Sequence, residues 1–293
     1  MNNNIEIKKW KNYTKIMGFK NSYSTEKDYL QEIVLNSLFY VSPVEDIIFI
    51  GGTAISKIYG SGRFSEDLDF IFDKSYDTSD VENRVKKAIN EVNNFYPIEY
   101  STLKRRDMLR YNLKIKGPFY EMSHSVRAIQ SIKLDINLYV RPFYNPKKVL
   151  RTTIYPEIRP YFLFTLETEE FAAEKIKAIM ERKNPVAWDL YDLWLLITKY
   201  NVKINMEMIN YKLQKYTQVQ GFNIDEFLEK VMLIGDIWNT EMESLLNVVI
   251  PFNTGVSPLN LDTFDDMVRL IKSFILLYLH RRTLSSYFYS ISV

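Results

Sequence analysis

Cysteine is absent from the sequence and histidine is scarce, which narrows the kinds of metal and catalytic site that the chain can form. Without cysteine, disulfide bonds and thiolate metal sites are excluded. The two histidines, His124 and His280, lie so far apart in the sequence that they make a poor case for a zinc site or a serine–histidine pair. Any metal ion must be held mainly by carboxylates, which suits Mg²⁺ or Mn²⁺.

The sequence also lacks a large excess of charge and a long apolar run. Its 38 Lys and Arg residues nearly balance its 36 Asp and Glu residues, so the overall charge gives no case for nucleic-acid binding, although local basic patches remain open. No stretch of about 18 apolar residues occurs, and the N-terminus does not read as a secretion signal. We therefore expect no membrane association and, by default, a cytoplasmic location.

The chain is long enough for one large domain or two of ordinary size, and its 46% hydrophobic content allows a substantial core. Strand and helix patterns mix in the first half, whereas the second half is mostly helical. Between them lie four prolines, at Pro142, Pro146, Pro156 and Pro160. We place a domain boundary there and expect an α/β (α+β) domain with a small mixed sheet over residues 1–150, followed by an α-helical C-terminal domain over residues 151–293.

Hydrophobic periodicity predicts the individual elements. Strands are expected, from β-branched or alternating apolar runs, over residues 47–50, 67–72, 108–115 and 129–139. Helices are expected over residues 53–60, 79–93, 167–182 and 188–199. A capping box at Thr25-Glu26-Lys27-Asp28 predicts a further helix that begins there.

Gly51 and Gly52 stand between the first predicted strand and a predicted helix. A strand that leads through a glycine turn into a helix leaves backbone N–H groups exposed at the helix N-terminus, where the helix dipole favours a phosphate. Glycine lets an anionic group approach that backbone closely. Thr53 could add a hydroxyl donor. A glycine pair alone is usually an ordinary turn, so the prediction depends on the motifs further along the chain.

Asp67 and Asp69 lie two residues apart on the next predicted strand, so their side chains point to the same face. Two such carboxylates repel each other unless a cation lies between them. Asp135 offers a third carboxylate on a strand that could lie alongside, placed to help deprotonate an acceptor hydroxyl. An Asp-x-Asp pair alone is usually solvated charge. The order strand, glycine pair, helix and acidic strand nevertheless favours metal-dependent nucleotidyl transfer, in which two ions stabilise an in-line displacement.

Arg63 and Ser65 stand just before this acidic pair. Arg63 could contact phosphate, or it could be an ordinary solvated loop residue. Lys57 lies on the predicted helix after the glycines, and the sequence does not fix its direction. The candidate nucleotide-binding residues of this region are Gly51, Gly52, Thr53, Arg63 and Ser65.

A second cluster lies in the helical half. Lys175 and Arg182 are seven residues apart on one predicted helix, hence on one face, and could reach a triphosphate. Asp189 and Asp192 open the next predicted helix and could orient those cations or hold an acceptor. The same four residues could instead form an interhelical salt-bridge network, and the residues alone favour neither interpretation.

At these residues the sequence resembles the AbiEii/AbiGii toxin family, within the minimal nucleotidyltransferase group of the polymerase-β-like superfamily. The matching segments run in the family's order between about residues 47 and 195. They are Gly51–Ala54, Arg63–Phe70, Lys133–Ile136, Glu174–Ile176 and Asp189–Leu193. The Arg63–Phe70 segment is specific, and the helical segment at the end is less so.

The resemblance implies a toxin of a toxin–antitoxin or abortive-infection system, which transfers nucleotides from an NTP and has a cognate antitoxin encoded nearby. Some relatives add pyrimidine nucleotides to the acceptor end of tRNA. By this resemblance Asp67 and Asp69 bind metal, and Asp135 fits the third acidic position of the superfamily. Lys175 would contact the triphosphate and Asp189 would complete the active site, which we expect between the two domains.

Two alternatives remain beside transfer to a tRNA or other RNA 3′ end. The acceptor could be a protein hydroxyl or a small molecule, or the chain could be a nucleotide-binding module that has lost catalysis. Lys104-Arg105-Arg106 with Arg110 forms the best local basic patch, followed by His280-Arg281-Arg282. Either patch could hold tRNA phosphates or be solvated surface.

Overall fold

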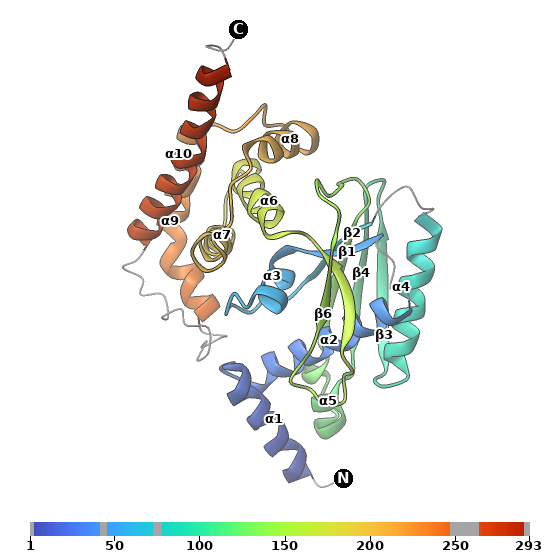
Figure 1. The fold of residues 1–293 in the computed structure, drawn as a ribbon. Coiled ribbons are helices and arrows are strands. Elements are labelled where there is room, and N and C mark those ends of the chain that lie inside the picture. Colours follow the sequence, from blue (N-terminus) through green and yellow to red (C-terminus); the bar gives the residue numbers. More distant parts are fainter. Residues whose placement is uncertain (1–2, 42–45, 73–77, 247–263, 290–293) are drawn as a thin grey trace. The chain divides into compact units, whose positions relative to one another are not determined.

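The computed structural model describes residues 3–41, 46–72, 78–246 and 264–289 (Figure 1). These residues form two compact units. The first comprises the described residues up to Leu166 together with Leu245 and Leu246, and the second comprises Glu167–Ser244 and Phe264–Tyr289.

The first unit is built on a seven-stranded mixed sheet. Its strands, in chain order, are β1 (Ile47–Ile50), β2 (Leu68–Phe72), β3 (Ile98–Lys104), β4 (Met108–Ile115), β5 (Gln130–Asn137), β6 (Lys147–Arg151) and β7 (Tyr161–Thr165). They lie side by side in the order β3-β4-β5-β2-β1-β7-β6. β1 pairs antiparallel with β2, whereas β2 with β5 and β1 with β7 are parallel pairs. β2, which carries Asp69 and directly follows Asp67, therefore lies at the centre of the sheet.

Helices pack against this sheet. In the first unit they are α1 (Asn3–Met17), α2 (Ser22–Val41), α3 (Gly51–Tyr59), α4 (Thr78–Asn93), α5 (Pro118–Ser123) and a short 3₁₀ turn η1 (Val126–Ala128). α2 packs on α4 and contacts β5 and β7, and α4 lies beside β3 (Figure 1). Phe39 of α2 lies over Phe70 of β2, with ring centroids 6.3 Å apart. This face of the sheet is the hydrophobic core of the unit.

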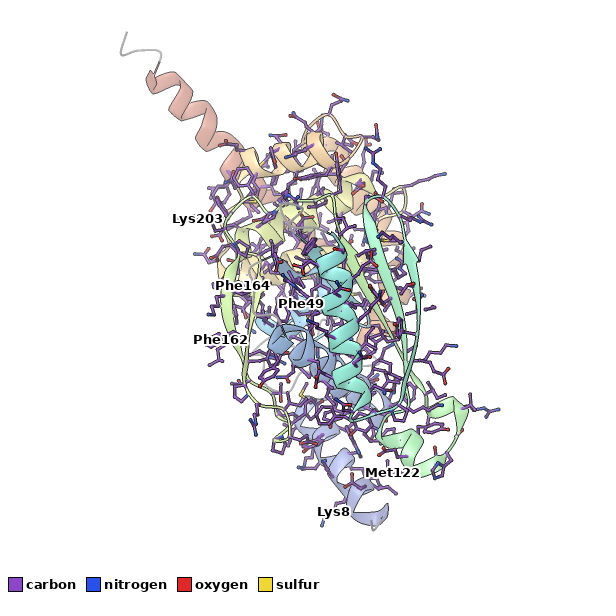
Figure 2. All side chains as sticks on the ribbon, turned by 90° about the vertical axis from the view of Figure 1, so that its right-hand side faces the viewer. Lys8, Phe49, Met122, Phe162, Phe164 and Lys203 are labelled. Atoms are coloured by element: carbon purple, nitrogen blue, oxygen red, sulfur yellow. The ribbon has the colours of Figure 1, made fainter. Side chains whose placement is uncertain are left out.

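Alternation along the strands separates the core face from the opposite face. In β4, every second residue from Leu109 to Ile115 is buried, whereas the residues between them are partly or fully exposed. β5 shows the same pattern, as the sequence predicts. Phe49 in the central strand β1 is fully buried, whereas Phe162 towards the sheet edge is 47% exposed (Figure 2). Each fully buried side chain of this size stabilises the fold by about 1.5–3 kcal/mol.

The beginning of α2 differs from the sequence-based prediction. The helix starts at Ser22, three residues before the expected capping box, and the Asn21 side chain accepts a hydrogen bond from the Ser24 N–H over 2.8 Å. Thr25 is fully buried within the helix, where its hydroxyl bonds to the Asn21 carbonyl. Asparagine is as good an N-cap as threonine, so the tertiary burial of Thr25 decides between them.

The sheet also runs past the boundary at residue 150 that the proline cluster suggested. β6 and β7 form a hairpin that joins β1 through Thr165, whose hydroxyl donates to the Phe49 carbonyl over 2.7 Å. Proline is compatible with the irregular segments before and between these strands, so its clustering did not mark a change of unit. β3, β6 and β7 were not among the expected strands.

All regular elements that the structure describes in the second unit are helices: α6 (Thr168–Glu181), α7 (Ala187–Tyr200), α8 (Met206–Tyr216), α9 (Ile224–Leu246) and α10 (Phe264–Tyr289). α6 packs against both α7 and α8. Lys212 of α8 is fully buried, and its Nζ lies 2.7 Å from Glu170 Oε1 and 2.7 Å from Glu174 Oε1 of α6. None of the described helices combines the length and apolar character that a membrane crossing requires.

Candidate active site

The glycine turn lies against the acidic strand. β1 ends at Ile50 and α3 begins at once with Gly51, whose φ of 78° is in the left-handed region that glycine adopts readily. A Cβ atom added at Gly51 would lie 2.4 Å from Oδ2 of Asp69. The N-terminal turn of α3 and the carboxylate are therefore in direct contact, as the order of the motifs suggested.

Arg63 occupies the other side of this turn. A Cβ atom added at Gly52 would lie 2.0 Å from a terminal nitrogen of the Arg63 guanidinium, so the side chain rests on the first turn of α3. Arg63 is only 7% exposed, and its carbonyl accepts a hydrogen bond of 2.7 Å from the Ser56 hydroxyl. A guanidinium beside the N–H groups of a helix N-terminus adds positive charge where an anion binds.

Sheet register aligns two of the three candidate metal ligands. Asp69 of β2 is the direct partner of Asp135 on β5 and of Ile50 on β1. Asp67 immediately precedes β2, which begins at Leu68. Leu68 is fully buried on the core face, so the two aspartates belong to the opposite face.

Asp135 and Asp67 each form an ion pair with a basic side chain. Arg110 of β4 is the register partner of Asp135, and its Nε and one terminal nitrogen lie 2.6 and 2.7 Å from the two carboxylate oxygens. Lys133 Nζ lies 2.8 Å from Oδ2 of Asp67. The hydrogen bond to Asp135 raises the pKa of Arg110, and the charges of Asp135, Asp67 and Asp69 raise it further. All three carboxylates thus act on one guanidinium.

These residues suit a hard divalent cation by their chemistry, because carboxylate oxygens are the ligands of Mg²⁺ and Mn²⁺. Asp69 and Asp135 lie on neighbouring strands in register, which fits a shared ion. Among the described residues, however, no group of three or more acidic, histidine or cysteine side chains is arranged around a common metal position. Asp67 and Asp135 are instead each paired with a cation of their own, Lys133 and Arg110.

Thr53 and Ser65 stabilise the segment that leads into β2 through hydrogen bonds. Thr53 is 1% exposed, and its hydroxyl donates to the carbonyl oxygen of Asp67. The Ser65 carbonyl accepts a hydrogen bond of 2.9 Å from the Gln31 side chain. Both contacts hold the segment before β2. The hydroxyl of Thr53, which the sequence offered as a phosphate donor, is directed to the backbone that carries Asp67.

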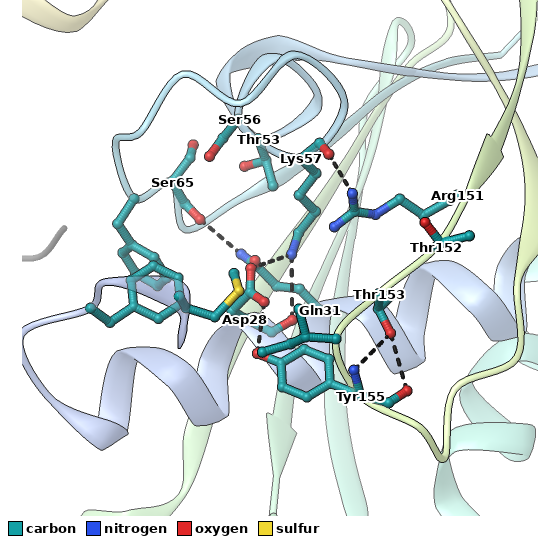
Figure 3. A pocket seen from close by; sticks show the side chains of 14 residues that line it. Asp28, Gln31, Thr53, Ser56, Lys57, Ser65, Arg151, Thr152, Thr153 and Tyr155 are labelled. Atoms are coloured by element: carbon teal, nitrogen blue, oxygen red, sulfur yellow. Dashed lines mark hydrogen bonds and ion pairs between the residues drawn. The ribbon is translucent and has the colours of Figure 1, made fainter. Parts of the chain in front are cut away.

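A cavity of about 370 Å³ lies behind α3 and is lined by Thr53, Ser65 and a group of buried charges (Figure 3). Lys57, whose direction the sequence left open, points into this group, with its Nζ 2.6 Å from Oδ1 of Asp28 and 3.0 Å from Oε1 of Glu32. Arg151 also bonds to Glu32 over 2.7 Å. Burial alone would raise the pKa of Glu32, but Lys57 and Arg151 outweigh it and lower that pKa to about 2.

In the second unit, ion pairs join the four candidate residues of the helical half, Lys175, Arg182, Asp189 and Asp192. Lys175 Nζ lies 2.9 Å from Oδ1 of Asp189 and 2.7 Å from Oδ2 of Asp192. Arg182 lies 2.5 Å from the other oxygen of Asp189. Lys175, Asp189 and Asp192 are buried, whereas the Arg182 side chain is 43% exposed. The salt-bridge network that the sequence allowed is present, and a role of Lys175 and Asp189 towards nucleotide stays a prediction.

The basic patch of the β3–β4 hairpin divides in two. Lys104, Arg105 and Arg106 are exposed around the turn, where Lys104 pairs with Glu82 of α4. Arg110, further along β4, pairs instead with Asp135, one of the three carboxylates of the cluster formed by Asp67, Asp69 and Asp135. Sequence reasoning missed this partnership and that of Lys133, although alternation in both strands places them on the aspartate face. The side chains of His280-Arg281-Arg282 lie outside the described residues.

Comparisons with known proteins identify the family of the chain and proteins of similar fold. A family model described as "Nucleotidyl transferase AbiEii toxin, Type IV TA system" matches residues 34–268. The JHP933 protein of Helicobacter pylori has a similar fold, with a TM-score of 0.52 and 18% identity over 91% of this chain and 97% of that one. An H. pylori protein assigned as a nucleotidyltransferase is also similar, with a TM-score of 0.50 and 18% identity over 88% and 96% of the two chains. No curated protein matches the sequence.

Proposed function

This chain belongs to the AbiEii nucleotidyl transferase toxin family of type IV toxin–antitoxin systems, and we propose that it transfers a nucleotide from an NTP to the 3′ end of an RNA, with tRNA as the acceptor. We propose further that the transfer depends on Mg²⁺ or Mn²⁺. The nucleotidyltransferase activity itself follows from the family.

The observation that carries the metal proposal is the alignment of Gly51, Asp69 and Asp135. The helix N-terminus at Gly51 offers backbone N–H groups to a triphosphate, and Asp69 touches that turn. Asp135 lies opposite Asp69 on the neighbouring parallel strand. A phosphate-binding turn next to two aligned carboxylates is the arrangement that a metal–triphosphate complex requires.

Each residue has a distinct part in this proposal. Asp67, Asp69 and Asp135 would hold the metal, which when bound supplies neutralisation of phosphate charge. Gly51, Gly52 and Arg63 would bind the phosphates, while Thr53 positions Asp67 through its backbone carbonyl. Lys175 and Asp189 of the second unit are proposed, from the family resemblance, to act on the nucleotide, and Arg182 is proposed from its place on the same helix face as Lys175.

Support for an RNA acceptor comes from the hairpin between β3 and β4. Lys104, Arg105 and Arg106 are exposed around the turn of this hairpin, and Arg110 lies four residues further along, on β4. Exposed basic side chains bind RNA phosphates in a salt-dependent way. We also propose a cognate antitoxin as partner, which the family's assignment to a type IV toxin–antitoxin system supports, and a cytoplasmic location.

Labelling experiments test both parts. The purified protein is incubated with total RNA, Mg²⁺ and each α-labelled NTP in turn, and we expect label in an RNA band of tRNA size. Asp69→Asn should abolish the labelling, because the substitution keeps the shape and removes the charge. Glu91→Gln removes an exposed carboxylate on α4 and should label as the wild type does.

Two outcomes would overturn the proposal in separable ways. Label that resists RNase but is lost with protease would move the acceptor to a protein hydroxyl. Label that persists in Asp69→Asn, or in the presence of a chelator, would rule out the proposed metal dependence of the transfer. A triple charge reversal at Lys104, Arg105 and Arg106 should weaken RNA labelling while leaving nucleotide binding unchanged.

A further inference from the structure

Arg110 and Lys133 neutralise carboxylates that a bound metal ion would otherwise neutralise. Arg110 engages both oxygens of Asp135, at 2.6 and 2.7 Å, and Lys133 engages Oδ2 of Asp67 at 2.8 Å. Lys133 lies on β5, the strand next to β2, and Arg110 lies on β4, the strand beyond β5, both on the face of the aspartates. A carboxylate that accepts a bidentate guanidinium has one lone pair of each oxygen directed at that cation.

The charges of the cluster show why the cations are needed. Counted formally, Asp67, Asp69 and Asp135 carry −3 and Arg110 with Lys133 carries +2, and the Arg63 guanidinium at the adjoining glycine turn adds further positive charge. Without the cations, three like charges would repel one another. Adding a divalent cation while both side chains stay would make the cluster positive.

We propose that Arg110 and Lys133 are exchangeable counter-ions: a divalent metal displaces them from Asp135 and Asp67, and the released side chains bind the phosphates of the nucleotide. This inference rests on the proposed metal-dependent transfer. It assigns to both residues a binding role towards substrate, and it makes metal entry and phosphate binding parts of one exchange.

The exposure of the two pairs fits exchange better than a purely structural role. The side chains of Arg110 and Asp135 are 32% and 20% exposed, and those of Lys133 and Asp67 are 37% and 44% exposed. Ion pairs this accessible to water contribute little to stability, so releasing them costs little. The pair of Arg151 with Glu32, whose carboxylate is fully buried, shows what a structural pair in this protein looks like.

Removing one cation should therefore have opposite effects on the two ligands. In Arg110→Gln, Mn²⁺ alone should bind about threefold to fivefold more tightly, because a competing ion pair of modest strength is gone. With Mg²⁺ present, a non-hydrolysable α,β-imido NTP should bind about tenfold or more weakly, because a charge-assisted hydrogen bond to phosphate is lost. Lys133→Gln should change both affinities in the same directions.

The experiment measures Mn²⁺ binding by electron paramagnetic resonance and analogue binding by calorimetry, on the full chain. Lys114→Gln is the matched control, because Lys114 lies on β4 on the same face as Arg110 but is exposed and pairs in register with Ser131. It should leave both affinities unchanged. Tighter Mn²⁺ binding together with weaker analogue binding supports the exchange.

Other results overturn it. Metal affinity that stays the same or falls in Arg110→Gln shows that the cation does not compete, and unchanged analogue affinity shows that it does not reach phosphate. These failures are distinguishable from failure of the proposed function. If wild-type protein binds no Mn²⁺, or if Asp69→Asn binds it as well as wild type does, the metal site itself is wrong.

Discussion

A side-chain carbon at Gly51 would lie 2.4 Å from Oδ2 of Asp69, so the glycine turn and the acidic strand touch each other directly. Register explains the contact, because Ile50, which precedes the turn, is the strand partner of Asp69. The φ of 78° at Gly51 adds a second constraint. Position 51 therefore requires glycine both for close approach and for backbone conformation.

Gly51→Ala is expected to damage catalysis more than stability. A left-handed backbone costs a non-glycine residue roughly 1–2 kcal/mol. Moving a catalytic carboxylate by about 1 Å lowers the rate by about 10²-fold. Rates of nucleotide transfer and urea midpoints measure the two effects. Gly18→Ala is the control, because Gly18 has a φ of 71° in the turn between α1 and α2. A wild-type rate in Gly51→Ala would refute the contact's importance.

Local patterns predicted the elements that carry the candidate site. The strand over 108–115 was placed at its observed bounds, and the strand over 47–50 likewise, because alternation and a short β-branched run ending in glycine are local signals. The acidic pair also needed only local spacing. In contrast, β3 is exposed at nearly every position, so it has no alternation to detect.

What the sequence could not provide was pairing between distant segments. Arg110 meets Asp135 because β4 and β5 pair in one particular register, and a slip of one residue would turn either side chain to the other face. Lys57 of α3 similarly pairs with Glu32 of α2, 25 residues earlier in the chain, because the tertiary fold brings the two side chains together. A charged residue on a helix looks solvated in the sequence, and only the packing shows that it is buried.

Thr53→Val should lower activity more than its effect on stability explains. The substitution keeps the shape but removes the hydrogen bond to the Asp67 carbonyl, which costs about 1 kcal/mol. It also frees the segment that positions Asp67, so the transfer rate should fall, whereas Thr53→Ser should keep it. Thr165→Val is the matched control, because its hydroxyl also bonds to a backbone carbonyl, that of Phe49. Equal rates in both valine variants would speak against a positioning role.

Stability should depend on pH through Glu32. Its pKa is lowered from 4.5 to about 2 in the folded protein, because Lys57 and Arg151 outweigh the effect of burial. A depressed folded-state pKa contributes stability above the unfolded value of 4.5, and that contribution is lost as pH falls towards 2. A shift of this size corresponds to stabilisation on the order of 3 kcal/mol. Urea midpoints between these two pH values measure the loss.

Glu32→Gln tests the assignment of that pH dependence. At neutral pH the variant should lose about 3–5 kcal/mol, because Lys57 and Arg151 stay behind as buried cations. Below pH 4.5 its stability should fall less steeply than that of wild type, with a remainder from Glu174, whose pKa is also lowered to about 2. A variant whose pH profile runs parallel to that of wild type would exclude Glu32 as the titrating group.

A comparison of Lys175 with Lys212 should distinguish a nucleotide-binding lysine from a structural one. Both are buried, and each lies within 3 Å of two acidic side chains in the second unit, Lys175 with Asp189 and Asp192 and Lys212 with two glutamates of α6. Replacement of either by Met should cost about 3–5 kcal/mol, because uncompensated carboxylates remain buried. Only Lys175→Met should also lose affinity for the α,β-imido NTP in its folded fraction, since the family resemblance gives Lys175 the triphosphate contact. Calorimetry at low temperature, scaled to the folded fraction from circular dichroism, makes the comparison. If the two variants keep the same analogue affinity, Lys175 is a structural residue, and the ion network of α6 and α7 is its whole role.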